Sequence, residues 1–232
     1  MKKRIISLTL ALLMVLSMTA CGSKPASNNP PAANNPTEAP VLEENALALG
    51  VVEGQTYANT YAGIGCALDG DWVIYPAEQL QELPDITKQM MEGTELEKAM
   101  ENVTQFTDMY AESVELLCNV NVLFQKLDMT QRIAYSVMDE KAVLDATMEQ
   151  KDTMIQAYAQ GGINVDTMEI VTVTFLGEEH YALKTVAETE GVPYYCLQVF
   201  DFWLGQYSMT ITFASFIEDN TESLLDLFYA VE

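Results

Sequence analysis

Positive charge is scarce in this sequence. Its 232 residues include 11 Lys and Arg against 34 Asp and Glu, which gives a formal net charge of −23. Residues 1–20 hold three of the basic residues and no acidic one, so the chain from residue 21 onward has 8 basic and 34 acidic residues and a charge of −26. A charge this negative argues against binding nucleic acid, or anionic lipid headgroups, through a basic patch. We therefore expect no nucleic-acid partner.

Histidine is nearly absent. Nucleophilic catalysis by Ser or Cys usually needs a base such as His, and the chain offers only His180, beside Glu178 and Glu179. We interpret His180 as an exposed hairpin residue, with a general base as the alternative. Acid pairs such as Glu188 and Glu190 are too common among 34 acidic residues to indicate glycoside hydrolysis. With no G-x-S-x-G, H-E-x-x-H or P-loop motif, we predict no enzyme activity, no catalytic residue, no metal site and no cofactor.

Cysteines are few, and their number after residue 21 is odd. Cys66, Cys118 and Cys196 form no C-x-x-C pair, and three thiols cannot pair completely. Cys66 and Cys118 fall in phase with apolar neighbours, which is typical of buried free thiols. We favour three free cysteines; one disulfide is the main alternative, and a metal or redox role is the third.

The opening apolar run is too short to span a membrane. Residues 5–20 are apolar apart from two Ser and two Thr, and they follow the basic residues 2–4. A spanning helix needs roughly 20 residues, so this pattern predicts a secretory signal peptide over residues 1–20. The sequence Met18-Thr19-Ala20-Cys21-Gly22 resembles a bacterial lipobox, although Leu is commoner at the position of Met18. The resemblance implies a diacylglyceryl group on Cys21.

Two other interpretations of this segment stay open. Cys21 is incidental if an ordinary signal peptide is cleaved, and the segment is an anchor if it is not cleaved. The lipoprotein is favoured because residues 21–52 are rich in Pro, Asn, Ala and Ser, a composition that predicts a disordered linker. Such a coil would hold a domain on the order of 30 Å from the bilayer. We expect a protein attached through the lipid on Cys21 to the extracytoplasmic face of the cell membrane.

Residues 53–232 have the length and hydrophobic content of one α+β domain. Alternating apolar residues predict strands at 59–68, 72–75, 108–113, 116–127, 166–176, 180–189, 194–204 and 207–215. In the strand 116–127, Cys118, Val120, Val122 and Phe124 share one face and Asn119, Asn121 and Gln125 the other. Short connections containing Gly177, Gly191 and Gly205 predict hairpins and hence an antiparallel sheet.

Helical patterns predict the layers that cover this sheet. Helices are expected at 77–83, 85–103, 139–160 and 220–230, with Gly161-Gly162 ending the third and Asp219 capping the last. Met90, Met91, Met100, Met148 and Met154 suggest either core packing, which we favour, or a copper site or promiscuous groove.

The strings Asn59-Thr60-Tyr61-Ala62-Gly63-Ile64 and Leu68-Asp69-Gly70-Asp71-Trp72 are similar to an opening that recurs in uncharacterised lipoproteins of Gram-positive bacteria. Asp108-Met109-Tyr110-Ala111-Glu112-Ser113 with Asn119-Val120-Asn121-Val122 resembles their central hairpin. Those proteins resemble the PsbP/Mog1/DcrB-like superfamily, which implies an α-β-α sandwich around an antiparallel sheet. Members are mostly non-enzymatic, and no functional residue carries over to this chain.

Three functions remain open from the sequence. The leading hypothesis is a non-enzymatic lipoprotein that binds an envelope protein partner. The second is a small-molecule-binding lipoprotein with a cleft lined by aromatic residues such as Trp72 or Trp203, and the third is a carboxylate-based hydrolase. Residues 200–204, where large apolar groups lie on both strand faces, indicate either a central strand covered on both sides or a partner surface at Trp203.

Overall fold

The computed structural model of the protein describes residues 48–76 and 105–231. The expected signal peptide, Cys21, most of the linker and the expected helices at 77–83 and 85–103 lie outside these ranges, as do the side chains of residues 201–203. Within the described ranges, no helix is both long and apolar enough to cross a membrane.

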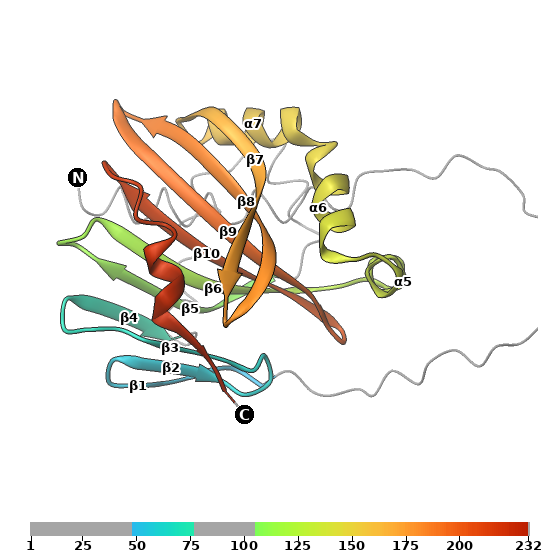
Figure 1. The fold of residues 1–232 in the computed structure, drawn as a ribbon, viewed down its shortest axis with the longest axis horizontal. Helices are drawn as coiled ribbons and strands as arrows, with labels where there is room; N and C mark the ends of the chain where they lie inside the picture. Colours follow the sequence, from blue (N-terminus) through green and yellow to red (C-terminus); the bar gives the residue numbers. More distant parts are fainter. Residues whose placement is uncertain (1–47, 77–104, 232) are drawn as a thin grey trace, which may run out of the picture.

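Seven antiparallel strands form the main sheet, in the order β4-β5-β6-β10-β9-β8-β7 (Figure 1). The strands are β4 (Trp72–Pro76), β5 (Gln105–Ser113), β6 (Cys118–Lys126), β7 (Ile163–Phe175), β8 (Glu178–Thr189), β9 (Val192–Leu204) and β10 (Tyr207–Phe216). The hairpins predicted from residue 108 to 127 and from residue 166 to 215 are confirmed.

Tight turns fix the register of the last four strands. Both residues of the turn from β7 to β8, Leu176 and Gly177, have positive φ angles of 52° and 86°. The turn from β8 to β9 repeats this pattern at Glu190 and Gly191, with 51° and 81°. Two left-handed residues make the turn that matches the right-handed twist of paired strands. Glycine in each turn removes part of the steric cost.

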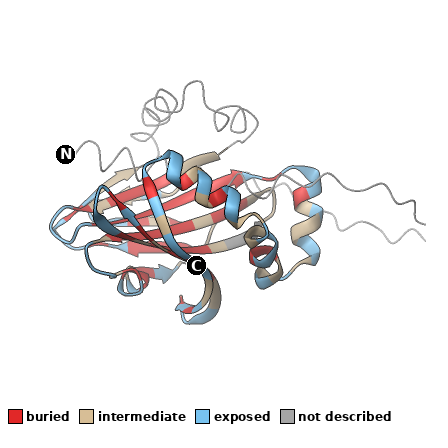
Figure 2. Ribbon diagram, turned by 90° about the horizontal axis from the view of Figure 1, so that it is seen from above, coloured by how far each residue is buried: buried red, intermediate tan, exposed pale blue. Residues whose placement is uncertain are grey.

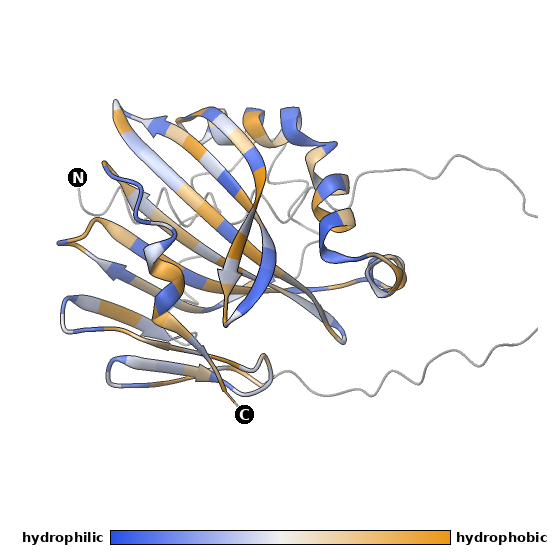
Figure 3. Cartoon of the chain, in the orientation of Figure 1, coloured by the Kyte–Doolittle hydropathy of each residue, from blue (hydrophilic) through white to orange (hydrophobic). Residues whose placement is uncertain are grey.

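The central strands β6 and β10 of the main sheet are buried on both faces, whereas the edge strand β7 exposes several residues (Figure 2). Helix-facing residues include Met168, Leu183, Tyr194, Cys196 and Ala214, which pack with helical residues Leu144, Met154 and Tyr158. The opposite face includes Val120, Val122, Leu197, Ile211 and Phe213. Alternation of apolar and polar residues along the strands is visible in Figure 3, but polar positions such as Asn119 and Asn121 are also buried, at 4% and 0% exposure.

A second, four-stranded sheet covers the face opposite the helices. Its order is β1-β2-β3-β11, from β1 (Val51–Glu53), β2 (Thr56–Asn59), β3 (Ile64–Ala67) and β11 (Phe228–Ala230). The single strand expected at 59–68 is wrong, because the chain turns between Asn59 and Ile64 at Gly63, whose φ is 68°. The strand expected at 72–75 is β4, which pairs with β5 in the main sheet.

Two short helices stand where one long helix was expected, and a third helix, which was not predicted, precedes them. These are α5 (Met129–Val137), α6 (Glu140–Met148) and α7 (Lys151–Gln160), so the continuous helix predicted over 139–160 is wrong. Because the helix is broken between α6 and α7, α6 can contact β8 and β9 while α7 contacts β7. A single straight helix could not make both sets of contacts over a twisted sheet. The predicted end of α7 at Gly161-Gly162 is confirmed, with Gly162 at a φ of 81°.

The C-terminal segment is also different from the prediction. In place of a helix at 220–230, the chain forms the 3₁₀ turn η2 (Ser223–Leu227) and then β11, which pairs antiparallel with β3. Leu224, Leu225 and Phe228 are buried against the main sheet. Pairing with a strand more than 150 residues earlier overrides the local helical pattern. The α+β class is thus observed, with helices on one face and, among the described residues, β structure on the other.

A buried carboxylate ties the two sheets together. Asp108 in β5 is 1% exposed and accepts hydrogen bonds from Tyr57 Oη at 2.8 Å and Asn59 Nδ2 at 2.8 Å. The backbone N–H of Gly50 donates to both carboxylate oxygens, at 3.0 and 2.9 Å. Gly50 has no room for a side chain, because a Cβ there would clash with the Tyr57 ring. Burial, with the nearby Asp108 charge, raises the pKa of Tyr57, so this phenol remains a donor.

We predict that Asp108→Ala lowers the free energy of unfolding by about 2–4 kcal/mol, because the buried donors of Tyr57 and Asn59 lose their acceptor. Denaturant unfolding measures the change. The matched control is Glu179→Ala, which removes an exposed carboxylate from β8 and should change stability by less than about 0.5 kcal/mol. Equal effects of the two substitutions would contradict a bonded anion at Asp108.

Candidate interaction surface

Five apolar side chains are exposed together at one end of the main sheet. They come from the turn between β5 and β6, the start of β9 and the residue after β10, and we call them the end patch: Val114 (49% exposed), Leu116 (52%), Leu117 (38%), Val192 (38%) and Ile217 (56%). Single exposed apolar residues are ordinary on protein surfaces, whereas adjoining ones mark interaction sites.

Backbone hydrogen bonds hold these three segments side by side. The N–H of Phe216 donates to the carbonyl of Leu117 at 3.0 Å, and the N–H of Ile217 donates to the carbonyl of Pro193 at 3.0 Å. The three segments also meet at the same end of the sheet in Figure 1. These hydrogen bonds therefore bring the three segments that carry the end patch together at one end of the sheet.

Two residues of the end patch have left-handed backbone. Leu117 has a φ of 52° and Ile217 a φ of 72°. The left-handed region costs a non-glycine residue roughly 1–2 kcal/mol and is rare for a β-branched one such as Ile. Both side chains are exposed, so burial does not offset this cost. Strain of this kind concentrates at functional sites.

Acidic residues surround the apolar centre. Glu115, Glu190 and Glu218 are exposed and lie next to end-patch residues in the sequence. No Lys or Arg occurs in residues 113–117, 188–193 or 216–222, the segments that form this end. The surface therefore combines an apolar centre with a negative rim.

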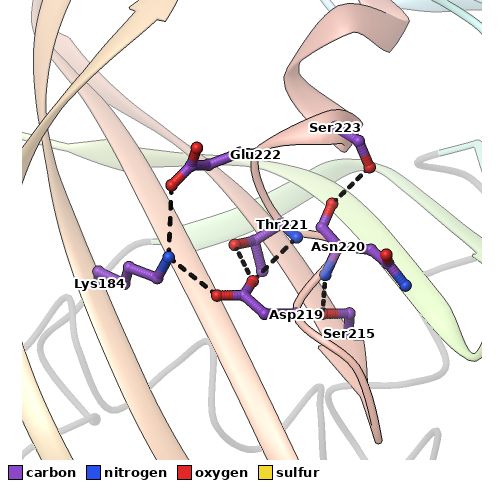
Figure 4. Close-up of polar contacts among 7 residues, drawn as sticks. All are labelled: Lys184, Ser215, Asp219, Asn220, Thr221, Glu222 and Ser223. Atoms are coloured by element: carbon purple, nitrogen blue, oxygen red, sulfur yellow. Dashed lines mark hydrogen bonds and ion pairs between the residues drawn. The ribbon is translucent and has the colours of Figure 1, made fainter.

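An ion-pair cluster fixes the loop that carries Ile217 and Glu218. Figure 4 shows Lys184 Nζ between Asp219 Oδ2, at 2.8 Å, and Glu222 Oε1, at 3.4 Å. The other oxygen of Asp219 accepts from the hydroxyl and N–H of Thr221, at 2.6 and 3.2 Å.

The same cluster sets the protonation states of its members. Hydrogen bonding to Asp219 raises the pKa of Lys184, although burial works in the opposite direction. Burial alone would raise the pKa of Asp219, but the hydrogen bonds from Lys184 and Thr221 outweigh it, so this pKa lies below its ordinary value. Both groups are therefore charged at neutral pH, and the loop is held by a full ion pair.

Among the described residues, His180 and the three thiols do not form a nucleophilic site with one another. His180 is partly exposed, as its expected hairpin position implies, and its Nδ1 lies 3.4 Å from Glu140 Oε1. Cys66, Cys118 and Cys196 are free, as expected, and buried in the core at 0%, 3% and 1% exposure. Burial raises the pKa of Cys66 and of Cys196 to about 12, which keeps these thiols protonated and unreactive.

The other candidate residues from the sequence lie in the core, against it, or outside the described residues. Trp72 is 3% exposed and packs in the core, so it lines no surface cleft. Met154 is a wholly buried core residue and Met148 packs against the core, while Met90, Met91 and Met100 lie outside the described residues, as do Cys21 and the Trp203 side chain. Residues 48–76 and 105–231 contain no group of three or more His, Cys, Asp or Glu side chains placed to hold a metal ion.

A polar row crosses the helix-facing side of the sheet. Tyr110, Asn121, Thr212 and Gln198 are successive cross-strand neighbours on β5, β6, β10 and β9, and each is at most 2% exposed. Gln198 Nε2 donates to Thr212 Oγ1 at 3.3 Å. Within the described structure, neither side-chain amide atom of Asn121 has a hydrogen-bond partner. The row belongs to the packed interior and offers no exposed surface.

The end patch was not predicted from the sequence, because each of its residues fits the pattern of a strand or of the turn beside it. The signal was present in Val114-Glu115-Leu116-Leu117, where a hairpin turn carries three large apolar residues in place of Gly, Asn or Pro. The sequence does not indicate that Ile217 belongs to this surface, because its left-handed backbone is seen only in the structure.

Comparison with known proteins gives a distant likeness to solved structures. No protein-family model and no curated protein matches the chain. Among solved structures, the chain is similar to cyanobacterial PsbP (CyanoP) from Synechocystis sp. PCC 6803, at 13% sequence identity and a TM-score of 0.45. The alignment covers 81% of this chain and 95% of that one. At this TM-score the likeness carries no argument about function, and membership of the PsbP/Mog1/DcrB-like superfamily stays a prediction.

We predict that Lys184→Met lowers the free energy of unfolding by about 1 kcal/mol, the scale of a partly screened ion pair. The control is Lys141→Met, which breaks the Lys141–Asp145 pair, whose side chains are 50% and 55% exposed, and should have no measurable effect.

The contribution of Asp219 should also depend on pH. Because its folded pKa is lowered, its stabilisation is present above the unfolded pKa of 3.8 and is lost as the pH falls through the lower folded value. The stability difference between the natural chain and Asp219→Asn should therefore be constant near neutral pH and shrink in acid. A difference that grows in acid would contradict the lowered pKa.

Proposed function

We propose that the protein is a non-enzymatic, lipid-anchored module of the extracytoplasmic membrane face that binds a protein partner through the end patch. The single observation that carries the binding role is the exposure of the large apolar side chains of the end patch on hydrogen-bonded segments, two of them, Leu117 and Ile217, on left-handed backbone. Selection for stability alone favours glycine at such left-handed positions. The large exposed side chains there are accounted for if a partner covers them.

The rim defines the chemistry of that partner. Glu115, Glu190 and Glu218 would repel anionic lipid headgroups and a second copy of this chain, whose net charge is −23. They attract a surface that presents an apolar protrusion surrounded by Lys and Arg. Rim charges of this kind mainly speed association and select the partner, while the apolar centre contributes most of the affinity.

Two features support the anchor and the lack of enzyme activity. The lipobox-like residues before Cys21 and the linker that follows favour tethering by two acyl chains, which is stable where one chain is marginal. The described thiols are buried and protonated, and His180 is paired with Glu140. This arrangement supports a binding role over nucleophilic chemistry.

The binding role is tested by photo-crosslinking in the host cell. A benzoylphenylalanine at position 116, or at position 217, should form an adduct with the same protein, and Glu190→Lys should reduce the yield. The control position is Tyr229, an aromatic residue of β11 that is 42% exposed and comparable with Leu116. An equal yield at position 229, or adducts only with lipid or a second copy of the chain, would overturn the proposal.

The anchor is tested by membrane fractionation and labelling with palmitate. The natural chain should sediment with membranes and take up label, and Cys21→Ala should do neither. An ordinary cleaved signal peptide would leave both chains soluble, whereas an uncleaved segment would leave both in the membrane without label.

A further inference from the structure

Helix α5 turns an apolar stripe toward solvent. Met129, Ile133 and Val137 are 64%, 60% and 81% exposed, and their four-residue spacing places them on one side of the helix. The one residue that α5 buries is polar, Gln131. An amphipathic helix on a soluble domain normally turns its apolar side inward. The stripe is therefore available to a surface outside the domain.

This helix lies at the end of the sheet opposite the end patch. It follows the last residues of β6, where the N–H of Leu127 donates to the carbonyl of Gln206 in the turn from β9 to β10, at 2.9 Å. The end patch begins at the other end of β6, beyond Cys118. Nine residues of strand separate the two ends, which is about 25–30 Å.

The chain enters the domain at the same end as α5. The side chain of Asn59 donates to the carbonyl of Ala48 at 3.1 Å, which places the first described residue beside the turn from β2 to β3. In that turn, the hydroxyl of Tyr61 donates to the carbonyl of Leu204, at the turn from β9 to β10. Ala48 and α5 thus lie at the same end of the main sheet, which we call the tether end (Figure 1).

The linker can bring the tether end to the bilayer. There are 26 residues between Cys21 and Ala48, and a random coil of that length has an end-to-end distance of about 25–30 Å. Shorter distances are well populated in such a coil. The lipid on Cys21, taken from the proposed function, would hold the stripe near the membrane at an effective concentration on the order of millimolar.

Local charge also favours this face for the membrane. Arg132 is the only charged residue within α5, and Lys126, Asp128 and Asp139 flank the helix. The formal charges of these two basic and two acidic residues sum to zero, whereas the chain from residue 21 carries a net charge of −26. Anionic headgroups therefore repel this face less than they repel the acidic rim of the end patch.

We propose that Met129, Ile133 and Val137 dock into the headgroup region of the bilayer that carries the Cys21 lipid. The contact is too small to recruit a free protein, but the tether makes it intramolecular. It orients the domain with the tether end on the membrane and the end patch directed away from it. The proposal rests on the lipid anchor of the proposed function and is independent of the partner.

The test uses a nitrobenzoxadiazole fluorophore on the lipidated chain, attached at Ile133→Cys. The three natural thiols are at most 3% exposed, so labelling is selective. The chain is reconstituted in phosphatidylcholine vesicles with and without doxyl-labelled lipid. We expect a blue shift and quenching at position 133, and neither at the control position, Leu116→Cys. Adding Val137→Glu to the labelled chain should abolish the quenching.

A second arm separates this proposal from the anchor. The Cys21→Ser chain with an N-terminal hexahistidine tag is held on phosphatidylcholine vesicles by a nickel-chelating lipid. Quenching at position 133 in this arm supports the docking surface even if the natural chain proves to carry no lipid. No quenching at position 133 in this arm, or equal quenching at positions 133 and 116, overturns it.

Discussion

The pairing of β6 with β10 holds the domain together. Nine residue pairs join these strands, from Cys118 opposite Ser215 to Lys126 opposite Tyr207, across about ninety residues of sequence. We call this pairing the seam. On one side of it lie β4 and β5, and on the other β7, β8 and β9. The core on the face opposite the helices depends on it, because that core takes side chains from β5 and β6 on one side and from β7 to β10 on the other. The core beneath the helices takes its buried side chains from α6, α7 and β7 to β10. The end patch depends on the seam too, since it places Leu117 beside Ile217.

The seam also explains which parts of the fold the sequence could predict. The hairpins of β5 with β6 and of β7 through β10 are local, and turn glycines with alternating side chains predict them correctly. The seam joins distant strands, and the pairing of β3 with β11 is more distant still, so neither leaves a local pattern. Residues 220–230 were predicted as a helix for this reason: their apolar spacing suits a helix, and the strand appears only when β3 is available. Likewise, residues 139–160 have continuous helical periodicity. The break between α6 and α7 follows from the twist of the main sheet on which they pack.

The same distinction holds for the candidate site. Leu116 and Val114 could have been recognised from the sequence as large apolar residues in a hairpin turn. The placement of this turn beside the residue after β10, the left-handed backbone and the support from Lys184 through Asp219 arise from tertiary structure alone. At Asn121 the sequence pattern is correct about the strand face, but it does not predict that this face is buried. Alternation predicted a polar face on β6, and the structure buries that face, leaving its amide without partners within the described structure. An unpaired buried amide costs about 1–3 kcal/mol, so Asn121 lowers the stability of the packed interior.

The strand β11 has a consequence for how the chain reaches its folded state. It contains residues 228–230 of a 232-residue chain, yet its partner β3 lies near the start of the domain. A chain that leaves a ribosome or a translocation channel from its N-terminus exposes the edge of β3 long before β11 exists to cover it. Phe228 likewise arrives last at a core already lined by Phe175 and Phe213. The four-stranded sheet can therefore close only after residues 228–230 have emerged, which makes the closing of this layer a late step in the folding of the domain.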